Sequence, residues 1–196
     1  QVRADNPTQD STAVFIIERD WSQSQKFYGW PEDRIVALHW WTGKNLTEQQ
    51  DTVIKLLRRF GVVGGVIDGR GLGLQLARAV KNAIPGMEVY EATAPSITQD
   101  LHDLTARVNN DRVKFYARTD PMRQEDAEFI AQLQHTKREV RSHQNFTLKK
   151  PSAKLHIDMV KALTYLGRVS KSPLLYQRFS ISRHEQSGPV IKDRSF

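Results

Sequence analysis

The chain has 196 residues, and 29 lysines and arginines against 22 aspartates and glutamates give it a formal net charge of +7 at pH 7. It contains no cysteine, which excludes disulfides, thiolate metal sites and cysteine nucleophiles. No apolar run reaches the roughly eighteen residues of a membrane span, and the opening QVRADNPTQD lacks the apolar middle of a signal peptide, so we expect an intracellular protein.

The predicted elements begin with two β-rich runs, residues 12–17 and 34–41, which we expect to pair as a hairpin. A helix over residues 47–60 follows, capped by Thr47 and ended by Gly61. Next come a strand ending before Asp68, a helix at 72–80, a strand at 87–92, a helix at 97–108, a strand at 113–117, and helices at 124–140 and 155–166.

Antiparallel strands followed by alternating strands and helices predict an α/β fold with a mixed sheet and helices on both faces. We expect one domain over residues 1–170. Apolar periodicity weakens from Lys171 onward, so residues 171–196 are predicted to be a C-terminal arm.

The stretch GVIDGRGLG at residues 65–73 raises the question of a nucleotide-binding loop. Its glycines, Gly69, Gly71 and Gly73, do not have the G-x-G-x-x-G spacing of a dinucleotide site. Asp68 would also place a negative charge against a bound pyrophosphate. Because sites in such sheets lie beyond the carboxyl ends of parallel strands, we predict that Asp68 is itself a site residue and that the glycines leave room for a ligand backbone.

Two further acids interrupt the apolar pattern. Asp5 lies in RADNPTQDST, just before the first strand, and Asp158 lies beside the apolar stripe of the last helix. Each acid alone has an ordinary explanation: an exposed loop residue for Asp5, a helix cap for Asp68, and a first-turn acid favoured by the helix dipole for Asp158.

With their neighbours, the three acids give the chain a resemblance to the nuclease domain of the large terminase subunit of tailed phages and herpesviruses. The segments that carry it are ADNPTQDSTAVFII, GVIDGRGLGLQLARAV and HIDMVKAL, the last being similar to the pattern H-D-D-x-x-x-A-L. HDLTARVNNDRVKF, at residues 102–115, is similar to the helix and strand that lie between the second and third motifs. The resemblance spans residues 2–169 and implies a ribonuclease H-like fold.

The resemblance also implies that Asp5, Asp68 and Asp158 are catalytic and hold two divalent cations, Mg²⁺ or Mn²⁺, which prefer oxygen ligands. Asp10 is either an additional acid near the ions or a solvated loop residue, and Gly69 lies beside the proposed ligands. Lys161 either contacts a phosphate or forms a surface pair along the helix. His156 is expected to point away from Asp158 if one helix contains both residues, but not if the helix starts later.

The chain departs from the family pattern in two places. Only Gln1-Val2-Arg3-Ala4 precedes Asp5, where the family has an apolar strand, and Lys161 stands where many relatives carry another acid. A fourth acidic ligand from that helix is therefore not expected.

Residues 136–156 form a basic segment with one acid, Glu139. We predict that it holds phosphates of duplex DNA without reading sequence, the alternative being a solvated helix end and loop. The basic residues of the segment that we assign to nucleic-acid binding are Lys137, Arg138, Arg141, Lys149, Lys150 and Lys154.

The predicted function is a metal-dependent endonuclease that cuts concatemeric viral double-stranded DNA during packaging, with little sequence preference. The chain has no GxxxxGK[ST] motif, so it is not expected to hydrolyse ATP. The resemblance implies an upstream motor ATPase domain, with the portal and the small terminase subunit as partners. The alternatives are a Holliday-junction-resolvase-like nuclease and a catalytically silent, basic nucleic-acid-binding module of the same fold.

Overall fold

A computed structural model describes residues 11–22, 24–27, 29–71, 73–116, 121–142, 145–150 and 156–169, without the side chains of residues 141, 142 and 146. The predictions for Asp5, Asp10 and Lys154, for the side chain of Arg141, and for the arm at residues 171–196 therefore lie outside the described residues.

The described strands and helices follow the predicted order, with two additional strands, β6 and β7, near the end of the chain. They are β1 (Ser11–Asp20), β2 (Glu32–Thr42), α1 (Leu46–Arg59), β3 (Gly65–Asp68), α2 (Gly73–Ala83), β4 (Met87–Tyr90), α3 (Ala94–Asn109), β5 (Val113–Phe115), α4 (Gln124–His135), β6 (Lys137–Ser142), β7 (Asn145–Lys149) and α5 (Asp158–Val169). Among the described helices, none has both the length and the apolar character needed to cross a membrane.

The pairing of the strands confirms the predicted mixed arrangement. β1 and β2 form the expected antiparallel hairpin, with an irregularity in register between Ile16 and Ile17. β5 then adds to β2 in parallel, and β3 and β4 form a separate parallel pair. Strands far apart in the sequence are thus brought together by parallel pairing, which needs the helical crossovers that the chain supplies.

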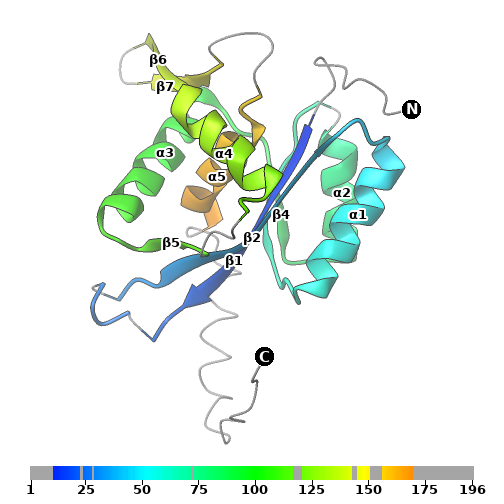
Figure 1. The fold of residues 1–196 in the computed structure, drawn as a ribbon, viewed down its shortest axis with the longest axis horizontal. Helices are drawn as coiled ribbons and strands as arrows, with labels where there is room; N and C mark the ends of the chain where they lie inside the picture. The colour runs from blue at the N-terminus through cyan, green and yellow to red at the C-terminus, as the bar shows by residue number, and fades with distance from the viewer. Residues whose placement is uncertain are drawn as a thin grey trace, which may run out of the picture.

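Helices cover both faces of the hairpin, as predicted (Figure 1). On one face, Ile16 and Ala37 pack with α1 and α2 through side chains such as Val53 and Val80. On the other face, Leu38 belongs to a second core cluster. That cluster also contains Leu104 of α3, Phe129 of α4, and Met159, Leu163 and Leu166 of α5. The alternation of strand side chains between the two faces produces these two cores.

The prediction of a helix through Val140 was wrong, because α4 ends at His135 and residues 137–142 form β6. β6 pairs with β7 from Lys137↔Lys149 to Ser142↔Asn145. The residues KREV are acceptable in a helix, but their backbone groups find partners in a neighbouring strand that local sequence reasoning did not anticipate. The cap of α1 was also misplaced: Asn45, not Thr47, closes the capping box with Glu48.

A buried ion-pair cluster ties the hairpin to α3. The side chain of Asp33 on β2 is 0% exposed, and it pairs with Arg107 of α3, which is 4% exposed. Asp33 also accepts a hydrogen bond from Arg19 of β1 at 2.8 Å. Burial lowers the pKa of Arg107, and the charge of Asp33 opposes that shift. Two buried guanidinium groups therefore share the Asp33 carboxylate in a site with little water.

We expect Asp33→Asn to lower the free energy of unfolding by about 3–5 kcal/mol, because it leaves buried guanidinium charge uncompensated. Urea unfolding followed by circular dichroism measures the change. Asp111→Asn is the matched control, since Asp111 forms an ion pair with Lys114 at the surface, and it should leave the midpoint unchanged. Equal effects of the two substitutions would show that the buried cluster contributes no more to the free energy of unfolding than a surface ion pair does.

Candidate active site

Asp68 is the last residue of β3, which runs parallel to β4. Its Oδ1 accepts a hydrogen bond from the backbone N–H of Arg70 at 3.1 Å, and the side chain is exposed. α2 begins only at Gly73, so Asp68 does not occupy the cap position of that helix. The carboxylate therefore stands at the carboxyl end of a parallel strand, where sites in α/β sheets form.

Asp158 is the first residue of α5, and its carboxylate contacts side chains from β1, from the residues before α5 and from α5 itself. Ser11, at the start of β1, donates its hydroxyl hydrogen to Asp158 Oδ2. The Nδ1 atom of His156 lies 3.3 Å from the same oxygen, and Lys161 Nζ lies 3.7 Å from Oδ1. The side chain keeps 31% of its surface exposed, so other ligands can still reach it.

His156 does not point away from Asp158, because the helix starts later than predicted. α5 begins at Asp158, and His156 precedes it outside the helix. The rotation of about 100° per helical residue does not apply there. The contact of Lys161 with Asp158 matches the predicted pairing one turn along the helix.

Tyr165 lies on the same helix as Asp158 and interacts with Asp68. It lies about two turns after Asp158, on the same face of α5, and its ring packs edge-on against Tyr90 of β4 at 5.5 Å between centroids. Burial raises the pKa of Tyr165, and the charge of Asp68 and a hydrogen bond with Asp68 raise it further. The hydroxyl therefore stays neutral at ordinary pH and can donate to the Asp68 carboxylate.

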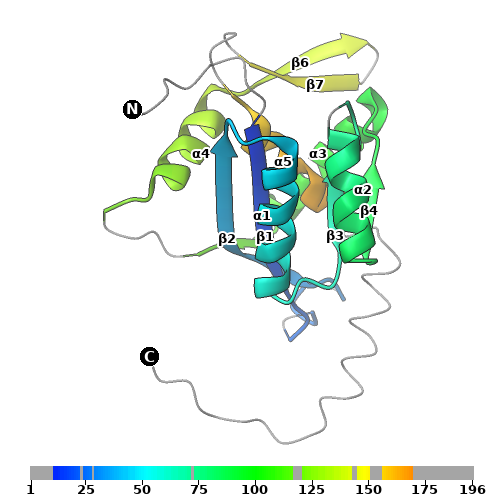
Figure 2. The same cartoon turned by 90° about the vertical axis from the view of Figure 1, so that its right-hand side faces the viewer.

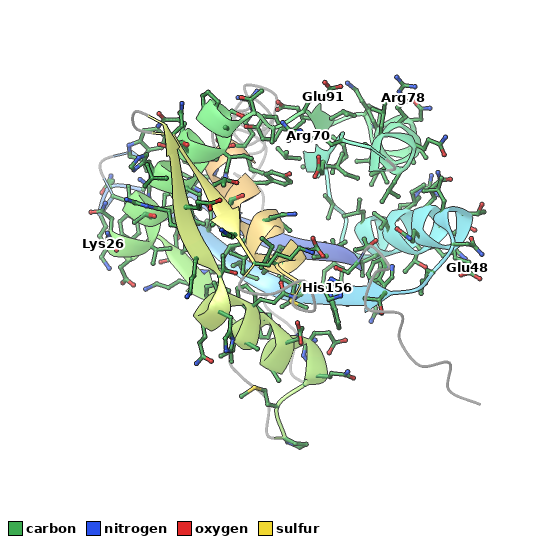
Figure 3. All side chains as sticks on the ribbon, turned by 90° about the horizontal axis from the view of Figure 1, so that it is seen from above. Lys26, Glu48, Arg70, Arg78, Glu91 and His156 are labelled. Atoms are coloured by element: carbon green, nitrogen blue, oxygen red, sulfur yellow. The ribbon has the colours of Figure 1, made fainter. Side chains whose placement is uncertain are left out.

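Asp68 and Asp158 line one cavity, whose volume is about 1520 Å³. Figure 3 looks down on this end of the molecule, with Arg70 on the β3–α2 loop and His156 ahead of α5. The residues around the two acids that share the lining are Ser11, Arg70, Gly73, Lys161, Ala162 and Tyr165. The structure thus brings two of the three predicted acids to the same space.

The glycines after Asp68 have packing roles that the sequence did not reveal. A Cβ atom on Gly69 would lie 2.6 Å from Val89 Cγ1 of β4, and one on Gly73 would lie 3.1 Å from the backbone oxygen of Asp68. Gly71 has a φ of +55° with open space around it. Gly69 therefore leaves no room for a side chain whatever approaches from outside, while a side chain at Gly73 would need its neighbour to move by a few tenths of an ångström.

The ligand chemistry fits a hard divalent cation, although the described residues do not make a complete site. Among residues 11–169, gaps excluded, no group of three or more histidine or acidic side chains could hold a metal ion. Asp68 and Asp158 supply carboxylate oxygens to one cavity, which is the donor type that Mg²⁺ and Mn²⁺ select. Asp5, the third predicted ligand, lies outside the described residues.

The basic segment contains a β-hairpin, β6–β7, where a helix end and loop had been considered. Lys137 and Lys149 lie opposite each other in its register, and Glu139 pairs with Lys149 at 2.7 Å. Lys137, Arg138, Lys149 and Lys150 are exposed. β7 packs near α3, and the hairpin lies at the same end of the molecule as the start of α5 (Figure 2).

Sequence reasoning missed Ser11 and Tyr165 as neighbours of the acids. Tyr165 had a usable signal, because its spacing from Asp158 places both on one face of a helix. Ser11 had none, since its contact with Asp158 joins residues 147 positions apart.

The arrangement is an α/β fold of the ribonuclease H-like class, with a mixed sheet, helices on both faces and acids at a strand end and a helix start. Solved structures with this fold include the large terminase nuclease from thermophilic phage G20c with bound magnesium, at 15% identity and a TM-score of 0.60, over 84% of this chain and 76% of that one. The same nuclease with bound cobalt matches at 14% identity and a TM-score of 0.55, over 85% of both chains. The sequence matches no protein-family model and no curated protein.

We expect Tyr165→Phe to lower the free energy of unfolding at pH 7 by about 1 kcal/mol, the usual worth of one hydrogen bond. Because the pKa of Tyr165 is raised on folding, its contribution is complete below the unfolded value near 10 and is lost as pH rises through the folded value. Phenylalanine does not ionise, so the variant should lose less stability above pH 10. Urea unfolding at pH 7 and above pH 10 measures both effects.

A double-mutant cycle with Asp68→Asn separates the contact from simple burial. Tyr165→Phe and Asp68→Asn should be non-additive. Tyr116→Phe, which removes a hydroxyl bonded to Asp126 of α4, is the control and should add to Asp68→Asn. Additive changes in the free energy of unfolding in both cycles would show that Tyr165 does not interact with Asp68.

Proposed function

We propose that this chain is a metal-dependent DNA endonuclease domain of a viral DNA-packaging terminase large subunit. It cuts concatemeric double-stranded DNA with little sequence preference, inside the infected host cell. Asp5, Asp68 and Asp158 are its catalytic residues and hold two divalent cations, Mg²⁺ or Mn²⁺.

The proposal depends on one observation: Asp68 and Asp158 line the same cavity. The fold that holds them is shared with solved terminase nucleases. Those two acids come from a strand end and a helix start that are distant in sequence. Carboxylates from distant segments that line one cavity supply the oxygen donors that hard divalent cations select. The neighbouring structures solved with magnesium and cobalt support the cation.

The surrounding side chains fix these carboxylates in place. Tyr165 is close enough to Asp68 for the charge of that carboxylate to raise the pKa of Tyr165, and Ser11 donates to Asp158, so each carboxylate has a neutral hydroxyl near it that adds no charge to the site. Bound divalent ions would supply the activation of water and the neutralisation of the leaving oxygen that phosphodiester hydrolysis requires. Arg70, which also lines the cavity, is placed to attract a phosphate.

The β6–β7 hairpin is the proposed DNA-binding surface. Lys137 and Lys149 are directly opposed across its two strands, an arrangement of like charges that is unfavourable in isolation. Glu139 neutralises part of this charge, and a phosphate backbone would neutralise more. Lys150 follows β7 in the chain, and both Lys150 and Arg138 are exposed. Contacts of this kind bind the duplex without reading bases.

The partners follow from the proposed family. An upstream motor ATPase domain would supply translocation, and the portal and the small terminase subunit would bring the chain to the DNA end. Asp10, Gly69 and Lys161 remain proposed neighbours of the catalytic acids. Lys161 contacts Asp158 at 3.7 Å, so it is placed to balance the charge of that carboxylate when no ion is bound.

We expect Asp68→Asn to abolish cleavage and to leave DNA binding equal or tighter, because the amide cannot ligate a cation as a carboxylate does and repels phosphate less. Plasmid nicking with Mn²⁺, with Mg²⁺ and with a chelator measures cleavage, and fluorescence anisotropy measures binding. The wild-type chain should nick with either metal and not with chelator. Asp51→Asn, in an exposed position on α1, is the control and should cut normally.

Unchanged cutting by Asp68→Asn would exclude Asp68 from the site. A preference of the wild-type chain for branched over linear duplex would favour a junction resolvase. Salt-dependent DNA binding without nicking in either metal would favour the catalytically silent binding module.

Replacing Lys149 and Lys150 with glutamine should weaken binding of duplex DNA and flatten the dependence of log K on log salt by about 0.9 per lost phosphate contact, so by up to about 1.8. Anisotropy titrations at several salt concentrations give the slope. In the matched control, Lys55 and Lys81, which are exposed lysines on α1 and α2, are replaced with glutamine. This control should leave the slope unchanged. The same flattening in both variants would mean that net charge matters and the hairpin does not.

A further inference from the structure

The two acids that line the cavity differ in the charge of their neighbours. Within the described part of the chain, Asp68 contacts neutral groups: its Oδ1 accepts a hydrogen bond from the backbone N–H of Arg70 at 3.1 Å, and the neutral hydroxyl of Tyr165 is near it. Asp158 has a positively charged neighbour, because Lys161 Nζ lies 3.7 Å from its Oδ1. A cation that approaches the two carboxylates therefore meets different local charges.

Both carboxylate oxygens of Asp158 have a partner. Oδ2 accepts the hydroxyl hydrogen of Ser11 and lies 3.3 Å from His156 Nδ1, while Oδ1 has Lys161 beside it. Of these three described partners, Ser11 and Lys161 line the cavity and His156 does not. The ring of His156 packs instead against Trp40 of β2, at 6.2 Å between centroids. The ammonium of Lys161 therefore occupies the space beside Oδ1 from which a cation in the cavity would reach this carboxylate.

The contact between Lys161 and Asp158 is electrostatic and easily broken. Its length of 3.7 Å exceeds the roughly 2.7–2.9 Å of a charge-assisted hydrogen bond. The side chain of Lys161 is 49% exposed, and its flexible stem lets the ammonium leave without a movement of the helix. The backbone stays in place, because the N–H of Lys161 donates to the Ile157 carbonyl at 2.9 Å. An ammonium and a divalent cation can thus exchange at Oδ1 while Asp158 keeps its position.

We propose that Lys161 competes with the divalent cation for Asp158, and so weakens cation binding at this acid relative to Asp68. The inference rests on the proposed cation site. In the absence of a cation, the ammonium of Lys161 compensates one negative charge beside the cavity. To receive a divalent cation, Asp158 has to give up that ammonium or hold the cation against its repulsion at short range. The described contacts of Asp68 are neutral, so Asp68 binds the tighter cation and Asp158 the weaker one.

Solvent limits the size of this competition. Asp158 keeps 31% of its side-chain surface exposed and Lys161 keeps 49%, so water and salt screen the pair. Exposed pairs of opposite charge change an equilibrium constant by up to about fivefold. We therefore expect removal of the ammonium to tighten cation binding at Asp158 by about this factor.

Manganese binding by the whole chain tests the competition without a cleavage readout. Electron paramagnetic resonance measures free Mn²⁺ during a titration, and the curve gives the dissociation constants of the tighter and the weaker ion. In Lys161→Gln, which removes the charge and keeps a good helix former, the constant of the weaker ion should fall about fivefold. Lys161→Arg keeps the charge and should bind as the wild type does. Lys55→Gln, in an exposed position on α1, removes the same charge elsewhere and should leave the constant unchanged.

The same titration tests whether Lys161 acts through Asp158. In an Asp158→Asn background, Lys161→Gln should no longer tighten Mn²⁺ binding, because the carboxylate for which the two cations compete is gone. Tightening that persists in that background would overturn the inference. An unchanged constant in Lys161→Gln, or equal tightening in Lys161→Gln and Lys55→Gln, would also overturn it and leave the proposed cation site intact. Failure of the wild type and of every variant to bind Mn²⁺ would overturn both.

Urea unfolding in chelator and in Mn²⁺ gives a second readout, which also reports whether each variant folds. A bound cation raises the unfolding midpoint by mass action, so Mn²⁺ should raise the midpoint further in Lys161→Gln than in the wild type or in Lys55→Gln. A purely structural role of Lys161 predicts a lower midpoint in chelator and the same response to Mn²⁺ as the wild type. That outcome would contradict the competition.

Discussion

The packing of α5 against both sheets is the constraint on which the rest of the site depends. Met159, Leu163 and Leu166 join the core on one face of the β1–β2 hairpin, and the same helix contacts β3. At Gly167, a Cβ atom would collide with backbone atoms of Asp100, so α5 and α3 approach closely. Because α5 is held by α3 and by both sheets, its first residue is fixed near β1 and its third turn is fixed near β3.

The polar contacts of the acids follow from that placement. A helix that crosses from β1 to β3 carries Asp158 at one end, where Ser11 meets it, and Tyr165 further along, where Asp68 meets it. The two carboxylates are thus coupled through one rigid element and not through loops. The hydroxyls near them are neutral, so the negative charges of both carboxylates remain available to whatever binds in the cavity.

Much of this architecture could be predicted from local sequence, and the exceptions have physical causes. Period-two and helical patterns located β1, β2 and α1 to within a few residues, and Asp68 was expected at a strand end because polar residues interrupt an apolar run there. β6 was missed because residues 137–140 have no strong local preference and become a strand through pairing with β7. The contacts of Ser11 and His156 with Asp158 depend on tertiary packing and on where α5 starts, which no local pattern specifies.

Asp5, the third acid, and Asp10 and Lys154 lie outside the described residues, so the full site stays a prediction.

The tight space at Gly69 affects how any mutational survey of this region should be interpreted. Its neighbour in the chain is Asp68, yet the nearest atom to an added methyl group belongs to Val89 on the adjacent strand. An alanine there would force Val89 or the backbone beside Asp68 to shift, because the added carbon would lie 2.6 Å from Val89 Cγ1. Loss of activity would then reflect a shifted strand, although an observer judging by proximity alone would assign the glycine a role in contacting substrate.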